Sequence, residues 1–511
     1  MRYFSKYQMQ AMEQLAVEKG VTMEDLMEHA GSAAVRFIRE KFDLNNKRIV
    51  ILCGKGNNGG DGFVAARLFS EMDLLPTVIL AEGKPTSKLA SQAFERIGDK
   101  VFVVDWESEN RAARQAISEA DLIVDGLYGF GFHGVMREPV AVLAELANRS
   151  RVPIVSLDIA SGVECDTGAV RGGCIRAKYT VTFTVPKPGH ILYPGREYCG
   201  EVTPVSAGID YEIVHQAIPV LETIEQSWVR SQFHPRDSES NKGDYGKLLC
   251  VCGSEGMAGA AIMCGMAALR CGAGLVNLAL PRSIYPIAAS RLLESVFTLL
   301  DQHGDRLAGE SMDRLFGALH SASACVIGCG LGTAPGIPPL VKLLLEKAPC
   351  PVVLDADGLN AICNDLDCLK QATAEKPVIV TPHPGEMARL LNVTAKEVQE
   401  KRLAAAQYFA HETGAITVLK GAGTLIALPN GRTYMNLTGN PGMARGGSGD
   451  ILAGMVGSFA AQGMEPSAAA RAAVYLHGLA GDQCAKRFSQ QGMMPTDMIA
   501  RLPQLFLKLE A

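Results

Sequence analysis

Short runs of Val, Ile and Leu recur through the first two hundred residues and alternate with segments of helical periodicity. Strands that are apolar at nearly every position are typical of a parallel sheet with helices on both faces. The alternation therefore predicts an α/β unit with three layers, α/β/α. The predicted strands lie at 47–54, 76–81, 101–104, 122–129, 153–160 and 181–185.

A second series of the same kind begins after residue 245 and ends in two predicted helices after Gly449. The segment between the two series, 210–235, is polar and lacks strand signals. We therefore predict two α/β domains, 1–216 and 228–511, with the boundary within 216–228. The predicted strands of the second series lie in 246–254, 274–281, 325–330, 351–358, 377–386 and 416–429.

Composition narrows the class of protein. A chain of 511 residues exceeds one ordinary core, and 48% hydrophobic against 20% charged residues is a globular balance. A net charge of −5 gives no general attraction to nucleic acid or anionic lipid. No apolar run suits a secretory signal or a membrane span. We expect a cytoplasmic protein without membrane or nucleic-acid partners, and an apolar composition that allows a homo-oligomer.

The fourteen cysteines raise the question of disulfides or zinc. No CxxC pair occurs, and Cys250 and Cys252 lie within one apolar strand-like run. This spacing favours small core residues in a reducing compartment.

A glycine-rich loop, "CGKGNNGGDG" at 53–62, follows the first long strand and precedes a helix. Open parallel sheets bind ligands at this position. The loop matches neither GxGxxG nor GxxxxGK[ST], so neither nucleotide fingerprint applies. Its glycines allow close approach to a phosphate or ribose, and Asn57, Asn58 and Asp61 offer polar contacts. The alternative is a structural tight turn.

Two further strand ends carry carboxylates. Asp125 precedes the loop Gly129–Val135, and Asp158 precedes Ser161. Carboxylates at successive strand ends are costly unless they share a ligand, a cation or a proton task. Oxygen donors without His or Cys suit a hard cation.

These segments resemble the N-terminal, Rossmann-like domain of the bifunctional NAD(P)H-hydrate repair enzymes, which is an NAD(P)H-hydrate epimerase. The resemblance implies a potassium ion held by Asn58, Asp125 and Ser161, and a catalytic role for Asp158. The implied contacts of the hydrated nucleotide are Asn57, Asn58, Gly59, Gly60, Asp61, Gly129, Phe130, Gly131, Phe132, His133, Gly134, Val135 and Asp158.

The chain departs from the family pattern at two positions: Phe130 stands where the family usually has Thr, and Ala160 where it has Pro. Both departures concern the shape of the loops. Lys187, in "VPKPGH", lies in a segment that also resembles the family, but a surface lysine is an equal interpretation.

In the second half, "RGGSGDILAG" at 445–454 places Asp450 at the start of an apolar helix. Helix N-termini attract anions, so a carboxylate there suggests a base beside a bound phosphate. The alternative is an ordinary stabilising charge at a helix start.

Four other loops accompany it: "KGAGT" (420–424), "TPHPGEM" (381–387), "GCGLG" (328–332) and the loop within 241–261. Together they resemble the ribokinase-like dehydratase domain of the same family, over about 241–490. By resemblance Ala260, Gly332, His383 and Asp450 contact the hydrate, although His383 alone could be a hydrogen-bonded loop histidine. The implied nucleotide-binding residues are Lys420, Gly421, Ala422, Gly423, Thr424 and Gly449.

The resemblance implies a bifunctional isomerase and lyase. It would interconvert the R and S hydrates of NADH and NADPH (NADHX and NADPHX) and dehydrate the S hydrate with Mg²⁺ and ADP or ATP, giving AMP or ADP and phosphate. ADP is the favoured donor. Two alternatives remain: a ribokinase-like kinase of a vitamin or sugar, and a nucleotide-regulated binding protein with inactive sites.

Overall fold

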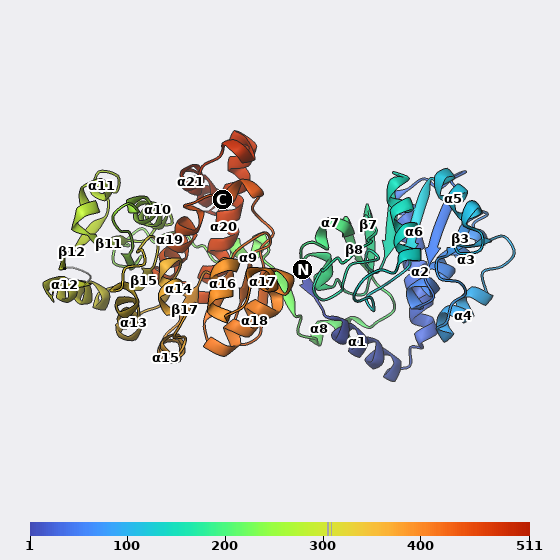
Figure 1. Ribbon diagram of the computed structural model, residues 1–511, viewed down its shortest axis with the longest axis horizontal. Helices are drawn as coiled ribbons and strands as arrows, with labels where there is room; N and C mark the ends of the chain where they lie inside the picture. The colour runs from blue at the N-terminus through green and yellow to red at the C-terminus, as the bar shows by residue number, and fades with distance from the viewer. Residues whose placement is uncertain (304–305, 308, 511) are drawn as a thin grey trace. The chain divides into compact units, whose positions relative to one another are not determined.

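The chain folds into two compact units in this computed structural model, which describes residues 1–303, 306–307 and 309–510 (Figure 1). The first unit spans Arg2–Leu221, and the second spans Glu222–Ala511 together with Met1. The division lies within the segment 216–228, where the sequence predicts the boundary.

A parallel sheet forms the centre of the first unit, in the order β4-β3-β2-β5-β6-β7-β8. The carboxyl ends of all these strands therefore lie at one edge. The strands β2, β5 and β6 are buried at every position, which explains their apolar runs. The strands are β2 (Ile49–Cys53), β3 (Thr77–Leu80), β4 (Phe102–Asp105), β5 (Leu122–Gly126), β6 (Ile154–Leu157), β7 (Tyr179–Phe183) and β8 (Glu201–Val205).

Helices cover both faces of this sheet. Alternate side chains of β2 enter different cores: Ile51 packs with Phe63 of α3, and Leu52 packs with Leu143 of α6. The predicted α/β/α layering is confirmed. After the short strand β1 (Arg2–Tyr3), the helices are α1 (Lys6–Glu18), α2 (Met23–Lys41), α3 (Asn57–Glu71), α4 (Lys88–Glu95), α5 (Asn110–Glu119), α6 (Glu138–Arg149), η1 (Pro188–His190), α7 (Arg196–Cys199) and α8 (Tyr211–Gln216).

The sheet of the second unit runs β9-β20-β19-β18-β17-β16-β15-β10-β11-β12. Its strands are parallel from β18 to β12, and β19 is antiparallel to both of its neighbours. A separate ribbon pairs β13 (Gln302–His303) with β14 (Arg306–Leu307). The sheet strands are β9 (Leu221–Thr223), β10 (Lys247–Val251), β11 (Leu275–Pro281), β12 (Val296–Leu300), β15 (Ala324–Ile327), β16 (Val352–Leu354), β17 (Val378–Val380), β18 (Ile416–Leu419), β19 (Leu425–Ala427) and β20 (Thr433–Met435).

Helices again flank the sheet; α10 and α19 pack on β10, whereas α15 packs on β17 and α18 on β18. This layering also agrees with the prediction. The helices are α9 (Gln226–Arg230), α10 (Ala258–Arg270), η2 (Arg282–Ile284), α11 (Tyr285–Ala289), α12 (Gly309–His320), α13 (Ile337–Lys347), α14 (Asp357–Ile362), α15 (Asp367–Glu375), α16 (Pro384–Leu391), α17 (Ala395–Glu400), α18 (Arg402–Thr413), η3 (Pro441–Met443), α19 (Ser448–Ala461), α20 (Pro466–Gly492) and α21 (Pro495–Glu510).

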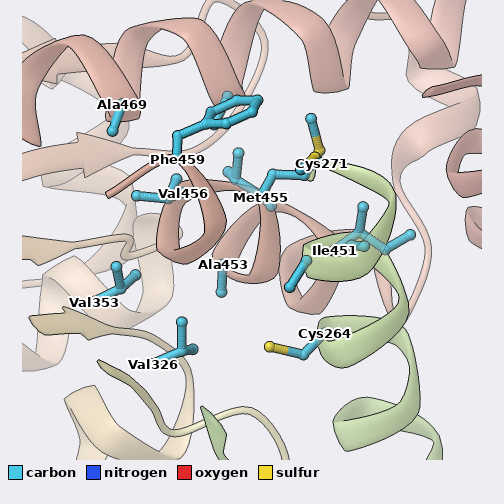
Figure 2. Close-up of a cluster of buried hydrophobic side chains, with 14 of the residues drawn as sticks. Cys264, Cys271, Val326, Val353, Ile451, Ala453, Met455, Val456, Phe459 and Ala469 are labelled. Carbon is cyan, nitrogen blue, oxygen red and sulfur yellow. The ribbon is translucent and has the colours of Figure 1, made fainter. Parts of the chain in front are cut away.

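Helix α19, which carries Asp450, is buried among α10, α20 and the sheet (Figure 2). Two glycines allow this close packing. A Cβ at Gly454 would lie 2.2 Å from the carbonyl oxygen of Cys264, and one at Gly457 would lie 2.3 Å from Val326 Cγ2. Because neither neighbour can move freely, the start of α19 is fixed relative to the sheet.

Several sequence predictions are wrong. Three helices, rather than two, follow the glycine loop, because the chain turns at Met493 before Pro495 opens α21. The boundary segment contains the short strand β9, which pairs with β20. The strands β8 and β12 are not predicted because they lie at sheet edges and are partly exposed, so they lack continuous apolar runs.

The burial of the cysteines agrees with the prediction that most of them are small core residues. All fourteen are free thiols, and twelve of them are buried. Across the described ranges, no helix is long and apolar enough to cross a membrane.

Candidate active sites

The first unit contains a cavity of about 660 Å³ at the carboxyl ends of β2, β5, β6 and β7. Most of the predicted contact residues line it: Asn57, Asn58, Asp61, Gly129, Phe130, Gly131, Phe132, His133 and Asp158. The glycine-rich segment is helical from Asn57 onward, so Gly59 and Gly60 lie in the first turn of α3. Gly59 has a packing reason, because a Cβ there would lie 1.9 Å from the carbonyl oxygen of Gly54. Gly134 and Val135 are not among the lining residues.

A buried ion pair forms the floor of this cavity. The ammonium group of Lys187, which is fully buried, donates to Asp158 Oδ1, to Thr182 Oγ1 at 3.0 Å and to the carbonyl oxygen of Phe183 at 3.2 Å. The interpretation of Lys187 as a surface lysine is therefore wrong. Burial alone would raise the pKa of Asp158, but Lys187 holds it below its usual range.

The loop after β5 is fastened to this ion pair. The backbone N–H of Phe130 donates to Asp158 Oδ2 at 3.1 Å, and the N–H of Gly134 donates to Glu164 Oε1 at 3.1 Å. Asp158 itself has a positive φ of 63°, a strained backbone conformation that is common at functional sites. The loop shape thus depends on Asp158, and Phe130 contacts the ion pair both through its backbone N–H and through its ring, whose centroid lies 5.9 Å from Lys187 Nζ.

Two other carboxyl groups face the same cavity, Glu13 of α1 and Asp61 of α3. Burial and the nearby charge of Asp158 raise the pKa of Glu13 to about 7. The same two causes, together with Glu13, raise the pKa of Asp61 well above its usual range. The cavity therefore holds protonated and ionised carboxyl groups at neutral pH.

Beneath the cavity, Asp125 is fully buried and accepts hydrogen bonds from Ser161 Oγ (2.6 Å), Ser161 N (3.0 Å), Ser156 Oγ (2.7 Å) and Leu127 N (3.2 Å). Burial raises its pKa. No cationic side chain of the described residues pairs with it. The nearby side chain of Asn58 is also buried, and its Nδ2 atom has no hydrogen-bonding partner.

The residues of the second site lie around the start of α19. The N-cap Gly447 has φ of 100°, and Asp450 lies in the first turn of the helix. Burial and repulsion from Asp355 raise the pKa of Asp450 to about 6. Gly449 lies beside this cluster, since a Cβ there would be 3.3 Å from Lys420 Nζ and 3.6 Å from Asp355 Oδ2.

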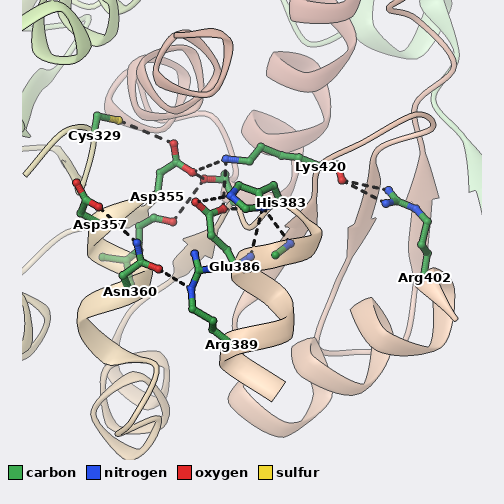
Figure 3. Close-up of polar contacts among 12 residues, drawn as sticks. Cys329, Asp355, Asp357, Asn360, His383, Glu386, Arg389, Arg402 and Lys420 are labelled. Atoms are coloured by element: carbon green, nitrogen blue, oxygen red, sulfur yellow. Dashed lines mark hydrogen bonds and ion pairs between the residues drawn. The ribbon is translucent and has the colours of Figure 1, made fainter. Parts of the chain in front are cut away.

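Lys420 links three strand ends in this site (Figure 3). Its Nζ lies 2.7 Å from Asp355 Oδ1 and 3.7 Å from Glu386 Oε2. Burial would lower the pKa of Lys420, but these two carboxylates raise it. Thr381 Oγ1 donates to Asp355 Oδ1 at 2.7 Å, which fixes the carboxylate.

Arg402 holds the predicted nucleotide-binding turn at 420–424 in place. Its guanidinium is largely buried and donates to the carbonyl oxygens of Leu419, Lys420 and Gly423 at 3.2 to 3.5 Å. The turn connects β18 to β19, and Gly421 and Gly423 have φ of 142° and 65°. An L side chain would be strained at either position.

His383 is the N-cap of α16, and its Nδ1 accepts from the N–H groups of Gly385 and Glu386 at 3.0 and 3.3 Å. Its Nε2 lies 3.3 Å from Glu386 Oε1. His383 is therefore hydrogen-bonded within its loop, and its contact with the hydrate stays a prediction. Through Glu386, the same histidine is joined to Lys420 (Figure 3).

The remaining predicted contacts lie on two neighbouring loops. Gly332 has φ of 80°, and its N–H donates to Asp357 Oδ2 at 2.8 Å. Ala260, in the first turn of α10, lies against Gly330, where a Cβ would be 2.8 Å from the Ala260 methyl carbon. The structure thus connects the 328–332 loop both to α10 and to the segment after β16.

Several polar residues of the two sites are not named as site residues from the sequence. They include Glu13, Asp355, Asp357, Glu386, Arg402 and His190, whose Nε2 atom lies 2.8 Å from the carbonyl oxygen of Asp158. Asp355 and Asp357 end the strand in "PVVLDADG", the signal already used for Asp125 and Asp158, so they could have been found. Glu13 and Arg402 lie within helices and carry no such signal.

Comparison with known proteins identifies the family of both units. A family model described as NAD(P)H-hydrate dehydratase matches residues 248–504, and one described as YjeF-related protein N-terminus matches residues 23–189. A bifunctional NAD(P)H-hydrate repair enzyme of Moorella thermoacetica is 39% identical over 492 residues, covering 95% of this chain and 92% of that protein. The enzyme of the same name from Escherichia coli is 36% identical and covers 95% and 90%.

A solved structure supports the fold of the second unit. A ribokinase-like superfamily protein from Enterococcus faecalis is 26% identical with a TM-score of 0.50, and the match covers 57% of this chain and 98% of that one. The two family models match in order along the chain, and the relatives align over nearly all of it. The chain therefore belongs to the family of bifunctional NAD(P)H-hydrate repair enzymes.

Proposed function

We propose that the first unit interconverts the R and S hydrates of NADH and NADPH, and that the second dehydrates the S hydrate with ADP or ATP. The products are the reduced dinucleotide, AMP or ADP, and phosphate. The observation that carries the proposal is Asp450, a base with a pKa near 6 in the first turn of α19, beside Lys420 and Gly449. Membership in the family supplies the substrates.

In the second site, the oxygen of the ring hydroxyl attacks the terminal phosphoryl group of the nucleotide. Asp450 accepts the hydroxyl proton as this bond forms. The N–H groups at the start of α19 and the Lys420 ammonium stabilise the charge on the transferred group. The C–O bond to the phosphate then breaks and the adjacent ring carbon loses a proton, so that inorganic phosphate leaves and the ring double bond is restored. Phosphorylation converts hydroxide, a poor leaving group, into phosphate.

Magnesium fits the donor set of this site. Asp355 and Asp357 both lie at the end of β16 and offer carboxylate oxygens, which Mg²⁺ prefers. Asp355 also raises the pKa of Asp450, so negative charge accumulates here despite Lys420. The ion would neutralise charge on the nucleotide phosphates.

Potassium fits the donor set of the first site. Asp125 is a buried carboxylate without a cationic partner among the described side chains, and Asn58 has an orphaned buried amide atom. Turning that amide by 180° would present its oxygen instead. With one formal charge between Asn58, Asp125 and Ser161, a monovalent ion balances the site better than a divalent one. Its role would be to hold α3 and the loops after β5 and β6 together around the substrate.

The rival function is a ribokinase-like kinase of a vitamin or sugar. Product analysis separates the two functions: the purified protein is incubated with mixed R and S hydrates and with ADP or ATP. The repair activity yields reduced nucleotide and inorganic phosphate in equal amounts. A kinase would accumulate a phosphorylated substrate and release no phosphate. A cytoplasmic location, a homo-oligomeric state and the preference for ADP stay predictions.

A further inference from the structure

The first cavity contains two carboxyl groups that are free to meet a ligand. Glu13 of α1 and Asp61 of α3 both line it, and neither side chain makes a hydrogen bond or ion pair with the described residues. Asp61 is only 9% exposed, so its missing partner is notable in a buried position.

Asp158, in contrast, already accepts several hydrogen bonds within the protein. Its Oδ1 atom accepts from Lys187 and from Thr182 Oγ1, and its Oδ2 atom accepts from the N–H of Phe130. All three protons of the Lys187 ammonium have acceptors within the protein. This ion pair is therefore suited to shaping the cavity and setting its charge rather than to exchanging protons with a substrate.

Inversion at the hydrated ring carbon requires proton transfer twice. The ring hydroxyl accepts a proton and leaves as water, while the electron pair of the ring nitrogen forms a C=N bond. Water then adds to the opposite face, the electron pair returns to nitrogen, and the new hydroxyl loses a proton. The steps need one donor and one acceptor, and no oxidant or reductant.

Glu13 and Asp61 have the protonation states for this chemistry. Burial and the charge of Asp158 place the pKa of Glu13 near 7, where a group both donates and accepts protons efficiently. The pKa of Asp61 is also raised well above its usual range, by burial first and then by the charges of Asp158 and Glu13. Two carboxyl groups that repel each other in one cavity hold a single proton between them over a range of pH.

We propose that Glu13 and Asp61 are the acid–base pair of the epimerase, one protonating the departing hydroxyl and the other accepting the proton of the incoming water. The inference rests on the proposed epimerase function. It assigns a catalytic role to a helix, α1, that lies outside the strand-end loops. When the two carboxyl groups exchange roles, the epimerisation runs in the opposite direction. Proton exchange with solvent restores the starting protonation of both groups.

Other titratable groups face Glu13 across the cavity and also shape its pH response. They are Asp61 on α3, Tyr128 and His133 on the loop after β5, Asp158 after β6 and Lys187 after β7. The helix α8, which packs on α1, contributes no titratable group to the lining.

The test compares Glu13→Gln with Glu18→Gln in the full-length protein. Glu18 lies on the same helix, is exposed, and its change removes the same charge. Epimerisation is followed by the interconversion of separated R and S hydrates, corrected for the spontaneous rate. We expect Glu13→Gln to lower kcat roughly 10²–10⁴-fold with little change in KM. We also expect it to abolish the pH limb near 7, while dehydration and Glu18→Gln stay at the wild-type level.

A kcat within threefold of wild type in Glu13→Gln, or a loss confined to KM, would overturn the acid–base role. If this variant fails to fold, Glu13→Asp decides: partial activity with a displaced pH limb supports the proposal, and an unchanged profile contradicts it. A wild-type protein without epimerase activity would instead overturn the proposed function, and the inference with it.

Discussion

Replacing Asp450 with Asn removes the proposed base and keeps the shape of its side chain. If Asp450 accepts the hydroxyl proton, dehydration falls roughly 10²–10⁴-fold, which corresponds to about 3–5 kcal/mol of transition-state stabilisation. Epimerisation stays intact, because its cavity lies in the other unit.

The same substitution is expected to lower activity but to raise stability. Burial and Asp355 raise the pKa of Asp450 from 3.8 to about 6, so the ionised carboxylate destabilises the folded second unit above pH 6. At 1.36 kcal/mol per pH unit, the penalty grows between pH 3.8 and about pH 6, stays at its upper limit of about 3 kcal/mol at higher pH, and is absent below about pH 4. Loss of a charge at the helix N-terminus offsets about 0.3–1 kcal/mol of the gain. Asp450→Asn is therefore expected to be more stable at pH 8 and nearly neutral at pH 4.

The assays are single-turnover dehydration of the S hydrate and thermal unfolding at both pH values, the latter without nucleotide or Mg²⁺. Gly317→Ala, at an open position in α12, serves as a control for substitution elsewhere in the same unit. Near-wild-type dehydration would refute the base role. Lower stability of Asp450→Asn at pH 8 would refute the electrostatic reasoning even if activity were lost.

Three further perturbations test other parts of the structure. Asp125→Ala should weaken the potassium dependence of epimerisation and spare dehydration, measured against potassium concentration at constant ionic strength; a wild-type rate indifferent to potassium would contradict the site. Burial, then Lys187, lowers the pKa of His190 to about 4, so this neutral histidine stabilises the fold above pH 6.5 and the benefit is lost as pH falls toward 4, by at most about 3 kcal/mol. His190→Asn should flatten that pH dependence in urea unfolding, and an unchanged slope would exclude the histidine as its source. Gly454→Val should destabilise the second unit by more than about 2 kcal/mol, because its Cβ would overlap the Cys264 carbonyl. A urea midpoint equal to that of the wild type would contradict this and would show that helix α10 can shift to make room.

The sequence predicts the buried parts of the fold well, because a parallel strand covered on both faces must be apolar at nearly every position. The strands β2, β5 and β6 carry this signal, and so the loop at 53–62, Asp125 and Asp158 could be placed at one edge of the sheet. The edge strands β8 and β12 escape prediction because solvent reaches part of each strand.

The site residues divide in the same way. Asp450 and Lys420 adjoin glycines whose backbone conformation or close contacts leave a recognisable pattern. Glu13 has no such pattern, since an acidic residue in an amphipathic helix is ordinarily solvated. Only the packing of α1 on the cavity shows that its carboxyl group is half-buried beside Asp158. Lys187 was ambiguous for a similar reason, because its burial depends on an ion pair distant in sequence.

The central proposal for this enzyme is that phosphoryl transfer in the second unit ends in elimination. The most direct measurement follows purified S hydrate with equimolar ADP or ATP and records reduced nucleotide and inorganic phosphate together. Both products are expected to appear at the same rate and in a one-to-one ratio, and a separate incubation that starts from the R hydrate should reach a comparable total yield through the first unit. Accumulation of a stable phosphorylated product without reduced nucleotide would contradict it and identify the second unit as a kinase.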